Sequence, residues 1–307
     1  MADAHGGKLQ HHPCRVGIQW IDRSRRQRCG SSRIADRRAS IGDSRPVSLG
    51  LTVLGGAAAW PNPGQGCSSY LVDDGETTLL LDCGPDTMST LRAETDYHDI
   101  DAIILSHWHS DHVLDIVPYR YGLVYGPGSL PRPIPLYVPP GISRRLDELA
   151  AALIDADDDP RAFWEGVFRI HEYGSSSDIN VGSFSIRFVE TQHYVPCFAA
   201  RVTHRDTRRV IVYSADAGVV EPLIDLFRGA DIAIVEATLD DHGETPRQDR
   251  GHLTPEDAGR LARMASVGTL VVTHLWSERD SATVVARAST QFHGPVIAAS
   301  AGMRINV

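Results

Sequence analysis

The chain has 307 residues, of which 42% are hydrophobic and 22% are charged, as in ordinary globular proteins. Its formal net charge of −9 argues against a protein built to coat nucleic acid. The five cysteines are scattered and never form a Cys-x-x-Cys pair, which argues against a disulfide framework and favours a reducing compartment.

Residues 1–46 differ in composition from the rest of the chain. They contain ten Lys or Arg against four Asp and no Glu, without helical or strand periodicity. We predict a basic, disordered tail followed by one folded domain over residues 47–307. A transit peptide, or a basic arm that touches nucleic acid, is the alternative for the tail. Because there is neither a secretory signal core nor an apolar run of about eighteen residues, we expect a cytoplasmic protein.

The remainder alternates between strand and helix patterns. Its first half predicts strands at 49–54, 67–72, 77–82, 101–105 and 134–138, and helices at 86–94, 113–124, 142–154 (capped by Ser143) and 160–166. Its second half predicts strands at 184–190, 199–203, 210–214, 232–235, 270–273 and, as the last strand, 296–299, with helices at 220–228, 254–265 and 281–290. Two such halves indicate an α/β fold in which two sheets pack together with helices outside. Segments 118–135 and 155–180 are expected to form loops that face the substrate.

One short stretch carries four side chains that bind metal ions well: His107, His109, Asp111 and His112. They follow the predicted strand 101–105, at the carboxyl end where α/β sheets commonly bind ligands. Three imidazoles and a carboxylate packed this closely give each other little stability unless a cation holds them. A histidine-rich loop without a metal is the alternative, and the position directly after a buried strand argues against it.

Three more residues with metal-binding side chains stand at predicted strand ends: His193, Asp216 and His274. Any one of them alone is more often an ordinary loop residue. Together with the first motif, they predict a single site at one rim of the sandwich.

A set of five histidines and two aspartates suits two cations. We expect three ligands for each cation and one bridging ligand: His107, His109 and His193; Asp111, His112 and His274; and Asp216. Two cations about 3.5–4 Å apart can deprotonate a water between them and stabilise charge on a substrate oxygen. The absence of thiolates from the set argues against a closed structural zinc site.

The His-x-His-x-Asp-His motif and these strand-end ligands resemble the metallo-β-lactamase-fold hydrolases over about residues 48–307. The resemblance implies a four-layer αβ/βα sandwich with two divalent metal ions, Zn²⁺ in first place and Mn²⁺ or Fe²⁺ as alternatives. It matches Asp82 to an aspartate that supports the ligand loop. Because the second histidine of the motif is present, the chain resembles the zinc hydrolase branch of this family. In the di-iron branch a Glu usually replaces that histidine. A homodimer is implied, with a monomer as the alternative.

Two later segments are similar to the Glu-Ala-Thr and His-x-Thr motifs of the ribonuclease Z-like phosphodiesterases: Glu236-Ala237-Thr238 and His252-Leu253-Thr254. The resemblance implies that His252, oriented by Glu236, acts as general acid or stabilises the transition state. With Asp111 these two are the predicted catalytic residues. A histidine beside a carboxylate suits protonation of a phosphodiester leaving group. The alternatives are a capping role for His252 and a backbone contact for Glu236.

The chain departs from ribonuclease Z between His193 and Asp216, where a predicted hairpin replaces the long arm that grips tRNA. This difference, together with the excess of acidic residues, makes tRNA 3′ processing the weaker hypothesis. We do not expect nucleic acid to be a partner. We expect a dinuclear-metal hydrolase that uses a metal-bridging hydroxide on a small-molecule phosphodiester, such as a cyclic nucleotide or an organophosphate.

The alternative is a lactonase or β-lactamase-like hydrolase of a cyclic ester or amide, for which Tyr194 is the candidate residue near the metals. Trp108, Trp276 and Tyr194 flank predicted ligands and could wall an apolar or aromatic pocket. Core packing is the alternative for each of them.

Overall fold

The computed structural model describes residues 49–128 and 132–307, so the predicted tail, 1–46, lies outside the described residues. The strands are β1 (Gly50–Ala57), β2 (Gly66–Cys67), β3 (Ser69–Asp73), β4 (Thr78–Leu81), β5 (Ala102–Ile104), β6 (Ile134–Val138), β7 (Phe168–Glu172), β8 (Asp178–Val181), β9 (Phe184–Glu190), β10 (Phe198–His204), β11 (Val210–Tyr213), β12 (Ile232–Glu236), β13 (Thr269–Thr273), β14 (Val296–Ala298) and β15 (Arg304–Asn306). They form one sheet in the order β15-β1-β3-β4-β5-β6-β7, with β2 beside β1, and a second in the order β14-β13-β12-β11-β10-β9-β8.

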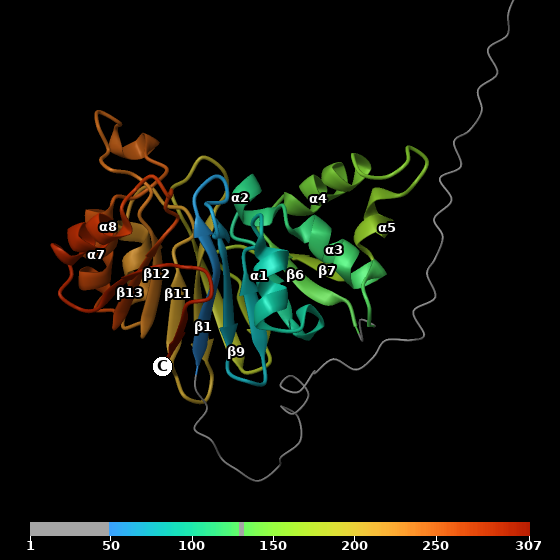
Figure 1. Cartoon of the computed structure of the whole chain (residues 1–307), viewed down its shortest axis with the longest axis horizontal. Helices are drawn as coiled ribbons and strands as arrows, with labels where there is room; N and C mark the ends of the chain where they lie inside the picture. Colours follow the sequence, from blue (N-terminus) through green and yellow to red (C-terminus); the bar gives the residue numbers. More distant parts are fainter. Residues whose placement is uncertain (1–48, 129–131) are drawn as a thin grey trace, which may run out of the picture. The chain divides into compact units, whose positions relative to one another are not determined.

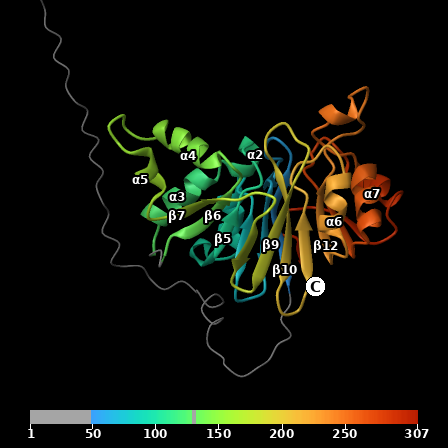
Figure 2. The same ribbon diagram turned by 180° about the vertical axis from the view of Figure 1, so that it is seen from behind.

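The helices lie outside the two sheets (Figures 1 and 2). They are α1 (Thr87–Glu94), α2 (Ser110–Val113), α3 (Ile116–Tyr125), α4 (Ile142–Ala151), α5 (Pro160–Trp164), α6 (Ile224–Phe227), α7 (Pro255–Ala265) and α8 (Ser281–Ser289), with 3-10 turns η1 (Tyr97–Asp99), η2 (Glu221–Leu223) and η3 (Arg247–Asp249). Helices α7 and α8 accompany β12 and β13, whereas α3, α4 and α5 accompany β6 and β7 (Figure 1). Within residues 49–128 and 132–307, no helix is both long and apolar enough to cross a membrane.

Three apolar cores lie between neighbouring layers of sheets and helices. Alternate residues of a central strand belong to different cores. In β12, Ile232 and Ile234 belong to the core between the sheets, whereas Ala233 and Val235 pack toward α7 and α8. A strand buried on both faces needs an unbroken apolar run, which is what this strand has. The third core lies between the first sheet and α1, α3, α4 and α5. The predicted four-layer αβ/βα sandwich is therefore confirmed.

Three details of the predicted elements are wrong. Ser143 does not cap α4, because Gly141 takes the N-cap position with a left-handed φ of 82° and the helix begins at Ile142. Val296–Ala298 is not the last strand, because β15 follows and pairs antiparallel with β1. Segments 118–135 and 155–180 are not all loop, because the first contains most of α3 and the second contains α5, β7 and most of β8. The three unpredicted strands, β7, β8 and β15, lie at sheet edges, and β8 and β15 carry a weak apolar pattern.

The topology brings the carboxyl ends of several strands to one rim. Strands β11, β12 and β13 are parallel neighbours, and β9 runs the same way because β10 is antiparallel to both β9 and β11. The end of β5 in the other sheet meets this rim, since the Phe198 N–H at the start of β10 donates to the Ser106 carbonyl at 3.1 Å. The loops that follow these strands carry all seven predicted ligands.

Candidate metal centre

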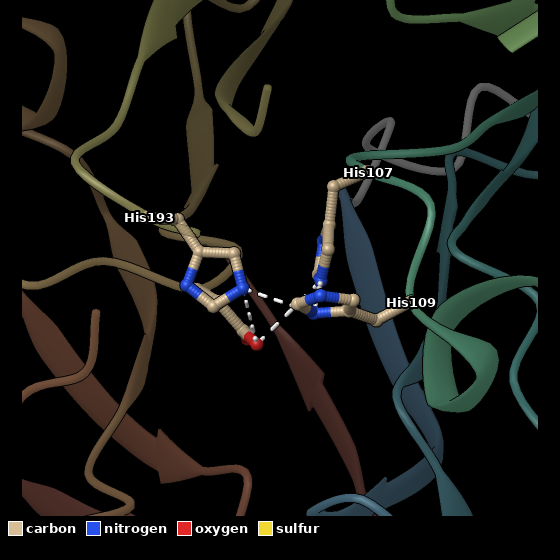
Figure 3. A group of neighbouring side chains, drawn as sticks. His107, His109 and His193 are labelled. Carbon is tan, nitrogen blue, oxygen red and sulfur yellow. Dashed lines mark hydrogen bonds and ion pairs between the residues drawn. The ribbon is translucent and has the colours of Figure 1, made fainter. Parts of the chain in front are cut away.

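Four of the predicted ligands form one group: His107, His109, His193 and Asp216, whose ligand atoms all lie within 4.8 Å of one another. The Nδ1 atom of His109 lies 3.1 Å from His107 Nε2 and 3.0 Å from His193 Nε2, and the three rings point toward one another (Figure 3). Tetrahedral nitrogen ligands around zinc, each about 2.0–2.1 Å from the ion, are about 3.3 Å apart. The three histidines therefore have the spacing that one cation requires.

The other three predicted ligands form the second group: Asp111, His112 and His274. The Nε2 atoms of His112 and His274 are 3.4 Å apart, and Asp111 Oδ2 lies 3.0 Å from His274 Nε2. This set also has the spacing of ligands around one cation.

Asp216 lies between the two groups. Its Oδ2 atom is 3.6 Å from His107 Nε2, and its Oδ1 atom is 3.5 Å from His112 Nε2. Oδ1 is buried and has no hydrogen-bond partner, which native proteins rarely tolerate. A cation beside each oxygen would satisfy this carboxylate, so the residues present fit a pair of metal ions that share Asp216.

Asp82 orients the histidines of the motif. Its carboxylate accepts hydrogen bonds from His112 Nδ1 at 2.7 Å, from the Ser106 hydroxyl at 2.8 Å and from the Tyr213 hydroxyl at 2.8 Å. The Ser106 hydroxyl can in turn accept a hydrogen bond from His107 Nδ1, 3.0 Å away. With metal ions bound, both histidines would carry their proton on Nδ1 and present an unprotonated Nε2 to the centre, as metal ligands must.

The other loops supply the same kind of support. His193 Nδ1 donates to the Gly251 carbonyl at 2.8 Å, and His274 Nδ1 lies 2.8 Å from the Thr238 hydroxyl. That hydroxyl donates to Glu236 at 2.6 Å. Ligand orientation thus depends on residues from β12 and the segment that follows it.

The backbone at the rim is strained at three residues that are not glycine. Asp82, Ala215 and His274 have left-handed φ angles of 58°, 49° and 60°. Each such residue costs on the order of 1–3 kcal/mol and persists only where the surrounding structure holds it, commonly at functional sites.

Burial and the neighbouring carboxylates shift the pKa values of these histidines in opposite directions. Burial lowers the pKa of His107 well below its ordinary value, with the neighbouring histidines acting the same way, so its imidazole is neutral. Burial also lowers the pKa of His112, but the carboxylates of Asp216, Asp82 and Asp111 outweigh it and raise the pKa to about 10. In this arrangement a proton on His112 offsets part of the negative charge of the three carboxylates, and bound metal ions would take the place of that proton.

His252 and Glu236, both predicted catalytic residues, are in contact. His252 Nδ1 lies 3.1 Å from Glu236 Oε1 and 3.9 Å from Asp216 Oδ2, and its side chain is 19% exposed. Burial lowers the pKa of His252, but the charges of Glu236 and Asp216 outweigh it and raise the pKa to about 9. His252 also forms a third group of metal-binding side chains with Asp216 and His274. His252 and Glu236 together can hold a proton beside the metal centre.

Three orienting residues were not among the predicted site residues: Ser106, Tyr213 and Thr238. Ser106 adjoins the histidine motif, and Thr238 belongs to the Glu-Ala-Thr segment, so a sequence motif could have indicated both residues. No sequence motif indicates Tyr213, which lies at the end of β11.

The comparisons with known proteins agree with this geometry. The model of the β-lactamase superfamily domain matches residues 77–275. The chain belongs to the β-lactamase superfamily. Within the superfamily it is 29% identical over 258 residues to the probable metallo-hydrolase YhfI of Bacillus subtilis, covering 82% of this chain and 97% of the relative. The crystal structure of YhfI is similar with a TM-score of 0.73 and 27% identity, covering 85% of this chain and 100% of that one.

A ribonuclease Z of Myxococcus xanthus is 26% identical over 302 residues, covering 84% of this chain and 98% of the relative. The superfamily, its metallo-hydrolase members and the clustered ligands identify the chain as a metal-dependent hydrolase.

Proposed function

We propose that this hydrolase cleaves a small phosphodiester with two divalent cations, zinc in first place. The seven clustered side chains would hold them: His107, His109 and His193; Asp111, His112 and His274; and Asp216 between. Two cations, when bound, lower the pKa of water and stabilise charge on a phosphoryl oxygen. The observation that carries the proposal is the contact between His252 and Glu236 beside Asp216.

The chain's own contribution to the chemistry is a proton held near the leaving group. Glu236 engages His252 through Nδ1, which leaves Nε2 to face a substrate. An alkoxide leaving group needs a proton, and the adjacent Glu236 carboxylate favours a proton on His252 by raising its pKa. Glu236 is itself held by the Ala217 N–H at 2.7 Å and the Thr238 hydroxyl at 2.6 Å, so its orientation is fixed.

A small substrate is supported by the segment between His193 and Asp216. It consists of β10, β11 and their connecting turns, without a long excursion. The net charge of −9 adds no general attraction for a polynucleotide. The relative named ribonuclease Z supports the phosphodiester class. We therefore favour a cyclic nucleotide or a similar small diester over the 3′ end of a tRNA.

A lactonase is the second candidate because of Tyr194. This side chain is 65% exposed, and its ring lies 5.0 Å from that of His193 and 5.9 Å from that of His252. A phenol at this position could contact the oxygen of a cyclic ester.

The test is turnover of four substrates by the zinc-loaded full chain: adenosine 3′,5′-cyclic phosphate, bis(4-nitrophenyl) phosphate, an acyl homoserine lactone and a precursor tRNA. We expect hydrolysis of the two small diesters and little of the other two. Lactone turnover without diester turnover would overturn the proposal in favour of the second candidate. Cleavage of the precursor tRNA alone would overturn the small-substrate part.

A further inference from the structure

Two tryptophans stack on each other, the exposed Trp60 and the partly buried Trp276. The rings of Trp60 and Trp276 are stacked, with centroids 5.8 Å apart and planes 18° from parallel. Trp60 is 53% exposed, although tryptophan is a costly residue to leave in water. Exposed tryptophan is also enriched where proteins bind their ligands.

Each tryptophan is joined to a residue of the second metal-binding group. Trp60 follows Ala59, whose N–H donates to Asp111 Oδ2 at 2.8 Å. Trp276 comes two residues after His274. The stacked pair therefore belongs to the two loops that contact Asp111 and contain His274, whereas Tyr194 adjoins His193 in the first group.

The pair is held in place by hydrogen bonds between its two loops. Asn62 Nδ2 donates to the Leu275 carbonyl at 2.8 Å, and the Ser277 N–H donates to Asn62 Oδ1 at 3.0 Å. The Leu275 N–H also donates to the Gly56 carbonyl at 3.0 Å. Because Asn62 stands between Pro61 and Pro63, the loop that carries Trp60 has little conformational freedom to lose on binding a ligand.

We infer that Trp60 and Trp276 form a stacking surface for the base of the substrate, which makes a nucleoside cyclic phosphate the substrate class. The inference rests on the proposed phosphodiesterase function. The half-exposed ring of Trp60 matches a nucleobase better than an alkyl chain or a bare sugar, because every base has a face that can stack. With the phosphate at the centre, the base would extend toward the Asp111 and His274 side.

The test compares two substrates that differ in the base alone: adenosine 3′,5′-cyclic phosphate and the ribose 3′,5′-cyclic phosphate that lacks it. In the zinc-loaded full chain, Trp60→Ala should raise the KM for the adenosine substrate roughly 5- to 150-fold, the range of one lost base stack, and leave the base-free substrate unchanged. Trp60→Phe should restore most of the difference.

A control on an exposed apolar side chain is available on α7. Met264 is 44% exposed and lies near the end of α7 that is opposite to His252. Met264→Ala removes an exposed apolar side chain outside the segments expected to face the substrate and should change neither KM.

A second readout does not depend on turnover. In saturation-transfer NMR on the metal-loaded protein with adenosine 5′-monophosphate, the adenine protons should receive saturation in the wild type and much less in Trp60→Ala. Equal KM changes for both substrates, or unchanged transfer in Trp60→Ala, would overturn the inference. If bis(4-nitrophenyl) phosphate is still hydrolysed in that case, the proposed function stands and the base contact alone is wrong.

Discussion

The Thr238 hydroxyl joins His274 to Glu236, with its oxygen 2.8 Å from His274 Nδ1 and 2.6 Å from Glu236 Oε2. Since Glu236 also contacts His252, one carboxylate at the end of β12 orients both a proposed metal ligand and the proposed acid. Residues in this position typically change metal affinity about 10- to 100-fold when mutated. We expect Thr238→Val to weaken zinc binding by that amount, measured by competition with a chromogenic chelator.

Thr238→Ser is the control for this prediction, because it keeps the hydroxyl and removes only a methyl group. It should bind zinc like the wild type. Equal zinc affinity in Thr238→Val would show that the hydroxyl does not orient His274.

His252→Ala should keep its metal and lose turnover about 10²- to 10⁴-fold, the usual contribution of a general acid. The loss should be larger for a diester with an alkyl leaving group than for bis(4-nitrophenyl) phosphate, because nitrophenolate leaves without a proton. The measurement is turnover of both substrates together with metal content. Loss of one metal ion in the variant would instead make His252 a ligand, through the third group with Asp216 and His274.

Arg279 holds the segment that follows β12. Its Nη1 atom donates to the carbonyls of Ala237 and Thr238 at 2.6 and 2.7 Å, and its side chain is only 10% exposed. Arg279→Ala should lower the free energy of unfolding by about 1–3 kcal/mol, because buried carbonyls lose their donor. Arg304 is the matched control, since its side chain is 54% exposed in its ion pair with Glu94, and Arg304→Ala should cost less than about 1 kcal/mol in urea denaturation. Equal costs for the two variants would contradict this.

Asp74 lies at the end of the sheets that is opposite to the metal centre. Its shifted pKa predicts that the stability of the fold depends on pH. Burial raises its pKa, but hydrogen bonds from Ser183 and from the Thr77 and Glu76 N–H groups, with the charge of His204, bring the pKa below its ordinary value. Because the folded pKa is the lower one, the carboxylate stabilises the fold above about pH 4, and this stability is lost as the pH falls through the folded pKa.

Asp74→Asn should therefore reduce the free energy of unfolding at pH 7 by about 1–3 kcal/mol. Urea denaturation at several pH values should show the gap to the wild type narrowing below pH 4. A gap that stays constant or widens there would show that the Asp74 charge does not stabilise the fold.

Much of the centre could be predicted because its ligands stand where strands end. A run such as Ile232–Val235 identifies a strand buried on both faces, and the polar residue after it must then lie at a rim. Parallel strands bring such residues to the same edge, so His193, Asp216 and His274 come together with the motif after β5.

The remaining features depend on contacts between distant parts of the chain. Nothing local indicates that the Tyr213 hydroxyl reaches Asp82, or that Trp60 stacks on Trp276, because both contacts follow from how the sheets and loops pack. β15 was not predicted for a similar reason, since a short and largely polar strand is defined mainly by its pairing with β1.

The most direct test of the dinuclear centre is the metal content of zinc-loaded wild type and Asp216→Ala, measured by elemental analysis after removal of free zinc. Asp216 lies between the two groups, and its Oδ1 atom has no hydrogen-bond partner. The predicted result is about two zinc ions per chain in the wild type, with loss of metal and diester turnover together in the variant. A variant that keeps two ions and full turnover, or a wild type that binds a single ion, would contradict a centre built around a shared Asp216.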